Sequence, residues 1–345
     1  MGDLQSTQLY RQATVDGVID IGGSKLPERL QAITFKHLNE PDQDGRYFLP
    51  DILFSNDTGL QLWHQVNHLP HYYQTDIEVK LLEEHAADIA RLIPAGSSVF
   101  DLGCGDVRKV RPVLDALEKL GKDVDYYGLD LSHKTLAANM ESLRSTYQFV
   151  QCFGLWGTFE DGFEWAKSIS GRRLFLSLGS IYSNDRFDRA VRYLKTCVGA
   201  MRPHDLMLIG IDCSPDPDAV WASYHDSSGI FEAFIRNGFQ HSNVVVGGQW
   251  YNDEDWEVRG VMEQQPPPLR HKFVLRAVRD VEHPPTALCF KAGTEIECYE
   301  GIKQTPDLMA RQLSSAGLHE LARWAEPTRT IYEYLVEPDL EGKGH

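Results

Sequence analysis

The segment VFDLGCGD fills residues 99–106, and the segment YYGLDLS follows at residues 126–132. Each begins as a short apolar run and contains an acidic residue, Asp101 in the first and Asp130 in the second. In a doubly wound sheet, two such strands lie side by side and form a crevice for a nucleotide at their carboxyl ends. The glycine turn after Asp101 lets the backbone approach a ligand closely, and Asp130 can accept hydrogen bonds from a ribose diol. The two segments therefore predict a nucleotide site on an α/β fold.

Strand-like and helix-like patterns alternate around these two segments. Apolar stripes predict helices at residues 76–93, 108–120, 134–143 and 186–200. Short apolar runs predict strands at residues 98–102, 125–129, 148–153, 173–178 and 206–211. Such an alternation is typical of a parallel sheet that is covered by helices.

The alternation ends after Asp212. Antiparallel strands are expected at residues 240–246, 256–263, 272–281 and 295–299, followed by a helix at 308–316 and a hairpin of residues 319–324 and 330–336. We therefore expect residues 78–213 and 305–345 to form the α/β core. Residues 214–304 are an insertion over the carboxyl end of its sheet, and residues 1–77 join the insertion as a substrate-binding domain.

Composition narrows the classes of partner. The chain of 345 residues has 34 Lys and Arg against 50 Asp and Glu, which gives a net charge of −16. Such a surface repels phosphate backbones and anionic lipid, so we expect no nucleic-acid or membrane partner. No apolar run approaches the roughly 18 residues of a membrane span, and the polar residues 1–8 are unlike a signal peptide. We expect a cytoplasmic monomer that acts on a small molecule.

The cysteines and histidines do not indicate a metal site or a disulfide framework. The six cysteines lie apart without a CxxC pair, and most fall in apolar runs, so reduced thiols are expected. The 13 histidines show no metal-ligand spacing. His68 and His71 flank a proline where a helix is expected to end, which favours a structural role for both. We therefore expect no bound metal.

The residues of the glycine turn favour one nucleotide over another. A dinucleotide fingerprint has a third glycine where this chain has Arg108, and here the acidic Asp101 stands just before the glycines. An acid there can pair with the α-ammonium of S-adenosylmethionine or order the turn, whereas pyrophosphate prefers bare glycines at a helix N-terminus. In the alternative, Asp101 and Asp130 only cap the helices that follow. Together, the two motifs favour S-adenosylmethionine over a nicotinamide cofactor.

Further motifs occur in a distinctive order along the chain. They are GLQLW (59–63), YY (72–73), RKV (108–110), YYGLDLS (126–132), GTFEDG (157–162), LGS (178–180), IGID (209–212), Tyr224 and AVRD (277–280). From about residue 53 to its end, the chain resembles the histidine α-N-methyltransferases of ergothioneine biosynthesis. It is more similar still to their relatives in fungal secondary metabolism that act on tryptophan or dimethylallyltryptophan.

This resemblance implies a fold and an activity. The implied fold is an α/β, Rossmann-like class I S-adenosylmethionine methyltransferase fold with an inserted α+β substrate domain. The implied activity is that of an S-adenosylmethionine-dependent N-methyltransferase (EC 2.1.1) with a free amino acid as its substrate. Both agree with the interruption of the α/β pattern after Asp212.

The resemblance and the residues together give candidate site positions. The expected contacts of S-adenosylmethionine are Asp101, Gly103, Gly105, Lys109, Asp130, Leu131, Phe153 and Gly154. The resemblance assigns the head group of the amino acid to Tyr73, Asn184 and Tyr224, which are the candidate catalytic residues. Two phenols and an amide can bind a carboxylate and orient the amine without adding a charge. From the residues alone, the tyrosines are as well explained as half-buried aromatics and Asn184 as a helix cap.

The chain departs from the family where the substrate side chain is bound. The histidine enzymes hold the imidazole with a glutamate and a serine two residues apart, and Tyr299 and Gly301 align with those positions. A one-residue slip brings in Glu300 but places Ile302 where the serine belongs. Either alignment leaves the imidazole clamp incomplete, and a polar site that lacks partners rejects its ligand. Phe273 aligns as an aromatic wall, so the pocket is predicted to favour a flat, larger ring.

Three functions are therefore weighed. The first is α-N-methylation of a free aromatic amino acid, tryptophan or a derivative. The second is the α-N-trimethylation of histidine, retained through altered contacts. The third, from another class, is a catalytically silent relative that binds the cofactor and regulates a partner. The complete set of Asp101, Gly103, Lys109 and Asp130 favours an enzyme.

Overall fold

The computed structural model describes residues 16–42, 45–182, 184–265, 267–283, 287–328 and 330–339. They form two compact units. Unit 1 contains the described residues of Met1–Gly23, Tyr73–Pro215 and Lys303–His345, and unit 2 contains those of Ser24–Tyr72 and Asp216–Ile302. Each unit is thus assembled from segments that lie far apart in the sequence.

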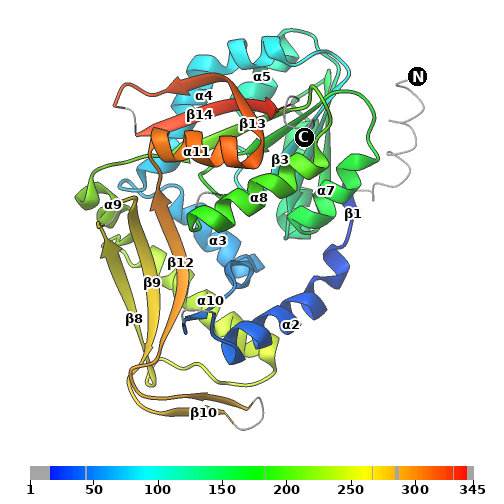
Figure 1. The fold of residues 1–345 in the computed structure, drawn as a ribbon. Coiled ribbons are helices and arrows are strands. Elements are labelled where there is room, and N and C mark those ends of the chain that lie inside the picture. Colours follow the sequence, from blue (N-terminus) through cyan, green and yellow to red (C-terminus); the bar gives the residue numbers. More distant parts are fainter. Residues whose placement is uncertain are drawn as a thin grey trace, which may run out of the picture. The chain divides into compact units, whose positions relative to one another are not determined.

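Unit 1 is built on an eight-stranded sheet (Figure 1). Its strands, in spatial order, are β1 (Val18–Asp20), β5 (Val150–Trp156), β4 (Val124–Asp130), β3 (Ser97–Leu102), β6 (Arg173–Ser177), β7 (Leu206–Asp212), β14 (Ile331–Pro338) and β13 (Leu318–Ala325). The first six strands run parallel, and the last two form an antiparallel hairpin whose strand β14 pairs with β7. The order reverses at β3, because β4 and β5 extend the sheet on one side and β6 and β7 on the other. A ligand crevice is expected at such a switch point, beyond the carboxyl ends of β3 and β6.

Helices cover both faces of this sheet. One face carries α4 (Tyr73–Leu92), α5 (Arg111–Lys119) and α6 (His133–Arg144), and the other carries α7 (Phe159–Lys167), α8 (Phe187–Ala200) and α11 (Pro306–Ala316) (Figure 1). Side chains alternate along a strand, so Val99 and Phe100 enter opposite cores. Burial on both faces explains why these strands are near-continuous apolar runs.

A row of aromatic rings crosses the sheet on the face of α7 and α8. Phe100 stacks on Tyr127 and on Phe175, with ring centroids 5.1 and 5.3 Å apart, and Tyr127 stacks on Phe153 at 5.3 Å. The four rings come from neighbouring strands and are all buried. Each such pair adds about 0.5–1.5 kcal/mol beyond its area of burial, so the row stiffens the strands that present the glycine turn.

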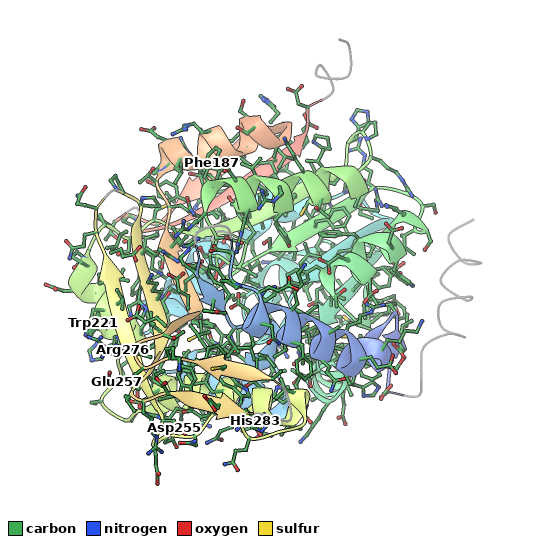
Figure 2. The ribbon with its side chains drawn as sticks, turned by 60° about the horizontal axis from the view of Figure 1, so that its bottom comes forward. Phe187, Trp221, Asp255, Glu257, Arg276 and His283 are labelled. Atoms are coloured by element: carbon green, nitrogen blue, oxygen red, sulfur yellow. The ribbon has the colours of Figure 1, made fainter. Side chains whose placement is uncertain are left out.

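Unit 2 combines a small sheet with helices. The sheet has the order β2 (Tyr47–Phe48), β12 (Glu295–Lys303), β9 (Leu269–Ala277) and β8 (Trp256–Glu263), and β10 (Val281–His283) pairs with β11 (Leu288–Phe290) as a separate hairpin. The helical elements are η1 (Gly23–Lys25), α2 (Leu26–Asn39), η2 (Asp51–Phe54), α3 (Asp57–Val66), α9 (Pro217–Tyr224) and α10 (Ile230–Val246). Glu257 and Arg276, labelled in Figure 2, are cross-strand partners of β8 and β9 with a 4.0 Å ion pair.

Two expectations from the sequence are corrected. The strand predicted at residues 240–246 is the last part of α10, because the buried residues Phe231, Phe234, Phe239 and Val246 follow a helical period that starts before that window. The assignment of all residues 1–77 to the substrate-binding domain is also corrected. Strand β1 pairs in parallel with β5 inside unit 1, and α4 of unit 1 begins at Tyr73.

Most of the other predicted elements agree with the structure, but the strand predicted at residues 272–281 divides into β9, which ends at Ala277, and β10, which begins at Val281. The five predicted core strands are β3 to β7, and the predicted C-terminal hairpin is β13 and β14. Helix α2 was not predicted. Among the described residues, no helix is both long enough and apolar enough to cross a membrane.

Candidate active site

The turn after β3 is built on two glycines. Gly103 has φ of 75° and Gly105 has φ of 38°, in the left-handed region that favours glycine. The N–H groups of Gly103 and Cys104 both donate to the carbonyl oxygen of Leu129, at 3.0 Å each. This pair of bonds ties the turn to the end of the neighbouring strand β4.

Asp130, at the end of β4, closes the turn from the other side. Its Oδ2 accepts a hydrogen bond from the Gly105 N–H at 3.0 Å, and its Oδ1 accepts bonds from the N–H groups of Leu131 (2.7 Å) and Ser132 (3.3 Å). Burial raises the pKa of Asp130, while the three N–H bonds oppose that rise. Asp130 does not cap α6, because the Ser132 side chain accepts the capping bond from Thr135 N–H. The capping alternative is therefore wrong for Asp130.

Asp101 lies beneath the turn. It is 3% exposed, and the Tyr126 hydroxyl donates to its Oδ2 at 2.9 Å. Burial raises the pKa of Asp101 to about 7, although the bond from Tyr126 and the charge of Lys109 oppose the rise. Asp101 does not cap α5 either, since that helix begins after Val110. Its side chain therefore joins the end of β3 to strand β4.

Lys109 lies among buried acids at the carboxyl ends of the central strands. Its Nζ is 2.8 Å from Glu78 Oε2, and Glu78 Oε1 accepts a bond from the Gly179 N–H at 2.6 Å. Gly179 has φ of 78°, in the region that favours glycine, and a Cβ there would lie 2.5 Å from Lys109 Nζ. Burial and the nearby Glu78 raise the pKa of Glu333 well above its usual value. Lys109 therefore neutralises an acid pair and fixes the loop that follows β6. Sequence reasoning missed Glu78 and Glu333.

Phe153 and Gly154 do not reach the carboxyl edge of the sheet. Phe153 is 1% exposed in the aromatic row, and the Gly154 N–H donates to Gly17 on the adjoining segment at 3.0 Å. Strand β5 continues to Trp156, and its edge is reached at Gly157, whose N–H donates to Asp130 O at 3.2 Å. The turn after β5 therefore lies nearer this edge than Phe153 and Gly154, whose contact with the cofactor stays a prediction. The signal for this was present in the GTFEDG motif at residues 157–162.

The described residues of this edge suit S-adenosylmethionine. A Cβ on Gly103 would be crowded, at 3.2 Å from Ile181 Cδ1, and φ there is positive, so the turn keeps a bare backbone at this position. Asp130 Oδ2 accepts one bond from Gly105, and a carboxylate oxygen has lone pairs for a ribose hydroxyl as well. Gly103, Gly105, Asp130 and Leu131 thus come together at the carboxyl ends of β3 and β4.

Tyr73 and Asn184, two of the predicted head-group residues, belong to unit 1. Tyr73 is the first residue of α4, and its hydroxyl donates to Asp212 Oδ2 at the end of β7, at 2.9 Å. Asn184 lies in the loop after β6, and its N–H donates to Ile181 O at 3.4 Å. It does not cap α8, whose N-cap position is Arg186. The cap alternative for Asn184 is therefore wrong.

The other predicted substrate residues gather inside unit 2. Tyr224 ends α9, Phe273 lies in β9, and Tyr299 and Gly301 lie in β12. The ring of Phe231, on α10, contacts three of them, with centroid distances of 5.2 Å to Tyr224, 5.5 Å to Phe273 and 5.7 Å to Tyr299. We call this group, with Trp63, Tyr72, Phe234 and His271, the aromatic cluster. The sequence analysis did not identify Trp63, Tyr72, Phe231, Phe234 or His271 as site residues. The buried stripe of α10, which contains Phe231 and Phe234, was the available signal.

Tyr299 is unusual within the aromatic cluster. Its φ of 39° is rare for a residue with a side chain, which indicates that its surroundings enforce this backbone conformation. Burial raises its pKa well above the usual value, and the phenols of Tyr72 and Tyr224 add to the rise. The phenol of Tyr299 is therefore neutral, and the position aligned with the family's glutamate carries no charge.

Gly301 has no room for a side chain. A Cβ there would overlap the Tyr224 hydroxyl oxygen and lie 2.8 Å from Tyr224 Cζ. The alternative alignment, which places Glu300 at the glutamate position, does not provide a carboxylate for an imidazole either, because Glu300 is paired with Arg270 of β9. Neither alignment thus provides the carboxylate and hydroxyl of an imidazole clamp.

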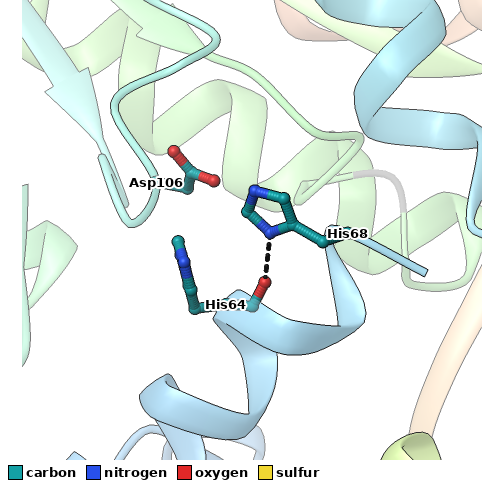
Figure 3. A group of neighbouring side chains, drawn as sticks. All are labelled: His64, His68 and Asp106. Atoms are coloured by element: carbon teal, nitrogen blue, oxygen red, sulfur yellow. Dashed lines mark hydrogen bonds between the residues drawn. The ribbon is translucent and has the colours of Figure 1, made fainter.

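Two histidines, His64 and His68, lie close together in unit 2. His68 Nδ1 lies 2.8 Å from the carbonyl oxygen of His64, one helical turn earlier (Figure 3). Within either unit taken alone, the described residues bring together no group of three His, Cys, Asp or Glu side chains that could hold a metal ion. Five of the six cysteines are buried, and Cys289 is exposed.

The reversed sheet order, the antiparallel last hairpin and the glycine turn with Asp130 define a Rossmann-like methyltransferase fold, as predicted. The chain belongs to the S-adenosylmethionine-dependent, histidine-specific methyltransferase family, whose family model matches residues 33–338. This membership confirms the predicted family, the class of S-adenosylmethionine-dependent N-methyltransferase, and the methyl donor.

Individual relatives differ in what their names state. Ergothioneine biosynthesis protein 1 of Neurospora crassa is 35% identical over 285 residues, which are 82% of this chain and 32% of that protein. This chain thus spans about a third of the length of that relative. The N-methyltransferase dtpB of Aspergillus flavus is 29% identical over 331 residues, 91% of this chain and 90% of that protein. The 4-dimethylallyltryptophan N-methyltransferase easF of Claviceps purpurea is 31% identical over 217 residues, 60% of this chain and 62% of that protein.

Solved structures are more distant. An S-adenosylmethionine-dependent methyltransferase from Clostridium acetobutylicum has 12% identity and a TM-score of 0.42, covering 81% of this chain and 98% of that one.

Proposed function

We propose that this enzyme methylates the α-amine of a free aromatic amino acid, tryptophan or a derivative of it. The observation that carries the proposal is the pair of Tyr299 and Gly301. A buried, neutral phenol stands at one position, and the Tyr224 hydroxyl fills the side-chain space of the other. An imidazole would find neither a carboxylate nor a serine hydroxyl at these positions, whereas rings of the aromatic cluster offer flat apolar surfaces.

Methyl transfer to an amine needs positioning more than covalent help from the protein. Bound S-adenosylmethionine supplies an electrophilic methyl group on its sulfonium. The chain's part is to bind both reactants, to orient the amine and to exclude water, and such positioning can account for much of the rate. Gly103, Asp130 and the turn after β5 are the residues proposed to hold the cofactor. Tyr73, Asn184 and Tyr224 are each proposed to hold the head group of the amino acid.

A mass-spectrometric screen tests the substrate. The enzyme is incubated with S-adenosylmethionine and an equimolar mixture of the twenty amino acids plus 4-dimethylallyltryptophan. The proposal expects new species 14 mass units, or a multiple of that, above an aromatic amino acid. Methylated histidine as the sole product would overturn the aromatic assignment and establish the second candidate. That candidate is favoured by the 35% identity to the Neurospora ergothioneine protein.

Calorimetry separates an enzyme from a silent relative. Titration with S-adenosylmethionine is expected to show binding that Asp130→Ala weakens at least about tenfold, since a lost charge-assisted bond is worth roughly 1.5–3 kcal/mol. Binding of the cofactor without methylation of any amino acid in the screen would favour the regulatory alternative. That the enzyme is cytoplasmic and monomeric stays a prediction, which fractionation of source cells and light scattering would test.

A further inference from the structure

A hydrogen-bonded chain of three side chains lies at the carboxyl end of β7 in unit 1. The Tyr73 hydroxyl donates to Asp212 Oδ2 at 2.9 Å, and Lys303 Nζ lies 2.6 Å from the same oxygen. Asp212 is 1% exposed and Lys303 is 4% exposed. Tyr73 begins α4, Asp212 ends β7 and Lys303 ends β12, so three distant segments of the sequence meet here.

The backbone around Asp212 fixes its carboxylate. Its Oδ1 accepts a bond from the Ser214 N–H at 3.0 Å, and its own N–H donates to Ser180 Oγ at 3.1 Å. Its carbonyl accepts a bond from the Gln304 N–H at 2.9 Å. Both carboxylate oxygens are thus used, and the residue cannot turn away from Tyr73 without breaking several buried bonds.

Lys303 and Asp212 form a buried ion pair. A buried carboxylate is stable when a cation and hydrogen-bond donors surround it, and protonating it would leave the ammonium buried without its partner. An ionised carboxylate has no hydrogen and can only accept bonds. The proton of the Tyr73 hydroxyl is therefore committed to Asp212, and toward any ligand the Tyr73 oxygen presents lone pairs alone.

We propose that Asp212 and Lys303 are positioning residues that make Tyr73 an acceptor for an N–H of the substrate's α-amino group, rather than a donor to its carboxylate. This inference rests on the proposed function, because it concerns the amine that is methylated. It also revises the role expected for Tyr73 from the sequence, which was to help bind the carboxylate.

The chemistry of methyl transfer favours an acceptor at this place. A neutral amine attacks with its lone pair, and a hydroxyl that donated to the nitrogen would occupy that lone pair. A hydroxyl that accepts an N–H orients the amine and leaves the lone pair free for the methyl group.

Substrate analogues distinguish an acceptor from a donor. The amino acid methylated in the screen supplies a pair of probes, one without the carboxylate and one without the amine. For tryptophan they are tryptamine and indole-3-propionate, and for histidine they are histamine and imidazole-4-propionate. Inhibition constants are measured for the wild type and Tyr73→Phe, with the cofactor affinity as an internal reference.

The proposal expects a selective loss. Tyr73→Phe weakens the amine-bearing probe by about tenfold and leaves the carboxylate probe within about twofold, as the loss of one hydrogen bond predicts. A loss confined to the carboxylate probe, or an equal loss of both, would overturn the inference. The mass-spectrometric screen comes first. If it shows no methylated amino acid, the proposed function itself fails, and this failure is distinguishable from a failure of the inference about Tyr73.

The positioning role is tested by removing both charges together. Asp212→Asn with Lys303→Met leaves no buried charge unpaired, and it is expected to lower kcat/KM about as much as Tyr73→Phe, with unchanged cofactor affinity. Adding Tyr73→Phe to that variant should cause no further loss, whereas additive losses would contradict the coupling. Tyr147→Phe is the matched control, because it removes a similar bond, to Asp115 at 2.7 Å, at the amino end of β5. Should the charge-free variant fail to fold, the probe experiment still decides the proposal.

Discussion

Tyr224 occupies the space in which any side chain at position 301 would lie. A Cβ on Gly301 would overlap the Tyr224 hydroxyl oxygen and come within 2.8 Å of Cζ. We therefore expect Gly301→Ser to lower the free energy of unfolding by about 1–3 kcal/mol, the usual cost of overpacking a closed site. Histidine methylation should not appear in this variant. Urea unfolding and the mass-spectrometric assay measure the two effects.

Gly199→Ser is a matched control for that substitution. Gly199 lies in α8, and a Cβ there would meet no atom within 4 Å, so the free energy of unfolding should change little. Tyr224→Phe combined with Gly301→Ser should recover part of the loss, because it removes the overlapping oxygen. A Gly301→Ser variant as stable as the wild type would contradict the packing that we describe.

Asp101→Asn should make stability less dependent on pH. Burial raises the pKa of Asp101 from an ordinary value of 3.8 to about 7. Between these values the native state holds a proton that the unfolded chain has released, so the wild type loses stability as the pH rises from about 4 to about 7. The loss has an upper bound of about 4 kcal/mol for a shift of this size. The asparagine keeps the oxygen that accepts from Tyr126 and does not titrate.

Thermal unfolding at pH 5 and pH 8 checks this prediction. At pH 5 the variant should melt only slightly above the wild type, because most of the loss that runs from about pH 4 to about pH 7 has not yet accumulated. At pH 8 the variant should melt several degrees higher, as about 2 kcal/mol predicts for a chain of this size. A variant that is less stable at both pH values would show that the ionised Asp101 is stabilised by groups beyond Tyr126 and Lys109.

Lys109→Met should strongly destabilise unit 1. It removes the cation 2.8 Å from Glu78, which is 2% exposed, and leaves two buried acids side by side. Breaking a buried ion pair from one side costs about 3–5 kcal/mol. The double variant Glu78→Gln/Lys109→Met should recover most of this loss, since no unpaired charge remains. Denaturant titration of the wild type, the single variant and the double variant measures the free energy of unfolding. Equal destabilisation of the two variants would show that the loss comes from packing rather than from an unpaired charge.

The core could be predicted from the sequence because both faces of the parallel strands are buried. Near-continuous apolar runs such as VFDL at residues 99–102 then identify strands without tertiary information. The same rule failed at residues 240–246, where VVV (244–246) has the composition of a strand. Those residues complete a helix whose buried period is set by Phe231 and Phe234, about three to four turns upstream.

Within the site, the glycine turn and Asp130 were predictable because local backbone bonds unite them. The bond from Gly105 to Asp130 joins strands that the sequence already identifies as neighbours. Glu78, Asp212 and Lys303 could not be found in this way. Each has its partner far away in the sequence: Glu78 pairs with Lys109 at a separation of 31 residues, Asp212 with Tyr73 at 139, and Lys303 with Asp212 at 91. Only the fold brings these pairs together.

Tyr299→Glu restores the family's acid and should still not create a histidine site. The side chain at this position is surrounded by the rings of Phe54, Trp63, Phe231 and Phe234. A carboxylate placed among them lacks a cation, so its pKa should rise and the free energy of unfolding should fall by roughly 3 kcal/mol at neutral pH. The loss should be smaller at pH 5 than at pH 8, since a group with a raised pKa loses stability as the pH increases. Tyr299→Phe, which keeps the ring, is the control and should cost less than about 1.5 kcal/mol. A glutamate variant of wild-type stability that methylates histidine would show that the charge of this one residue, and not the space taken by Tyr224, decides the substrate.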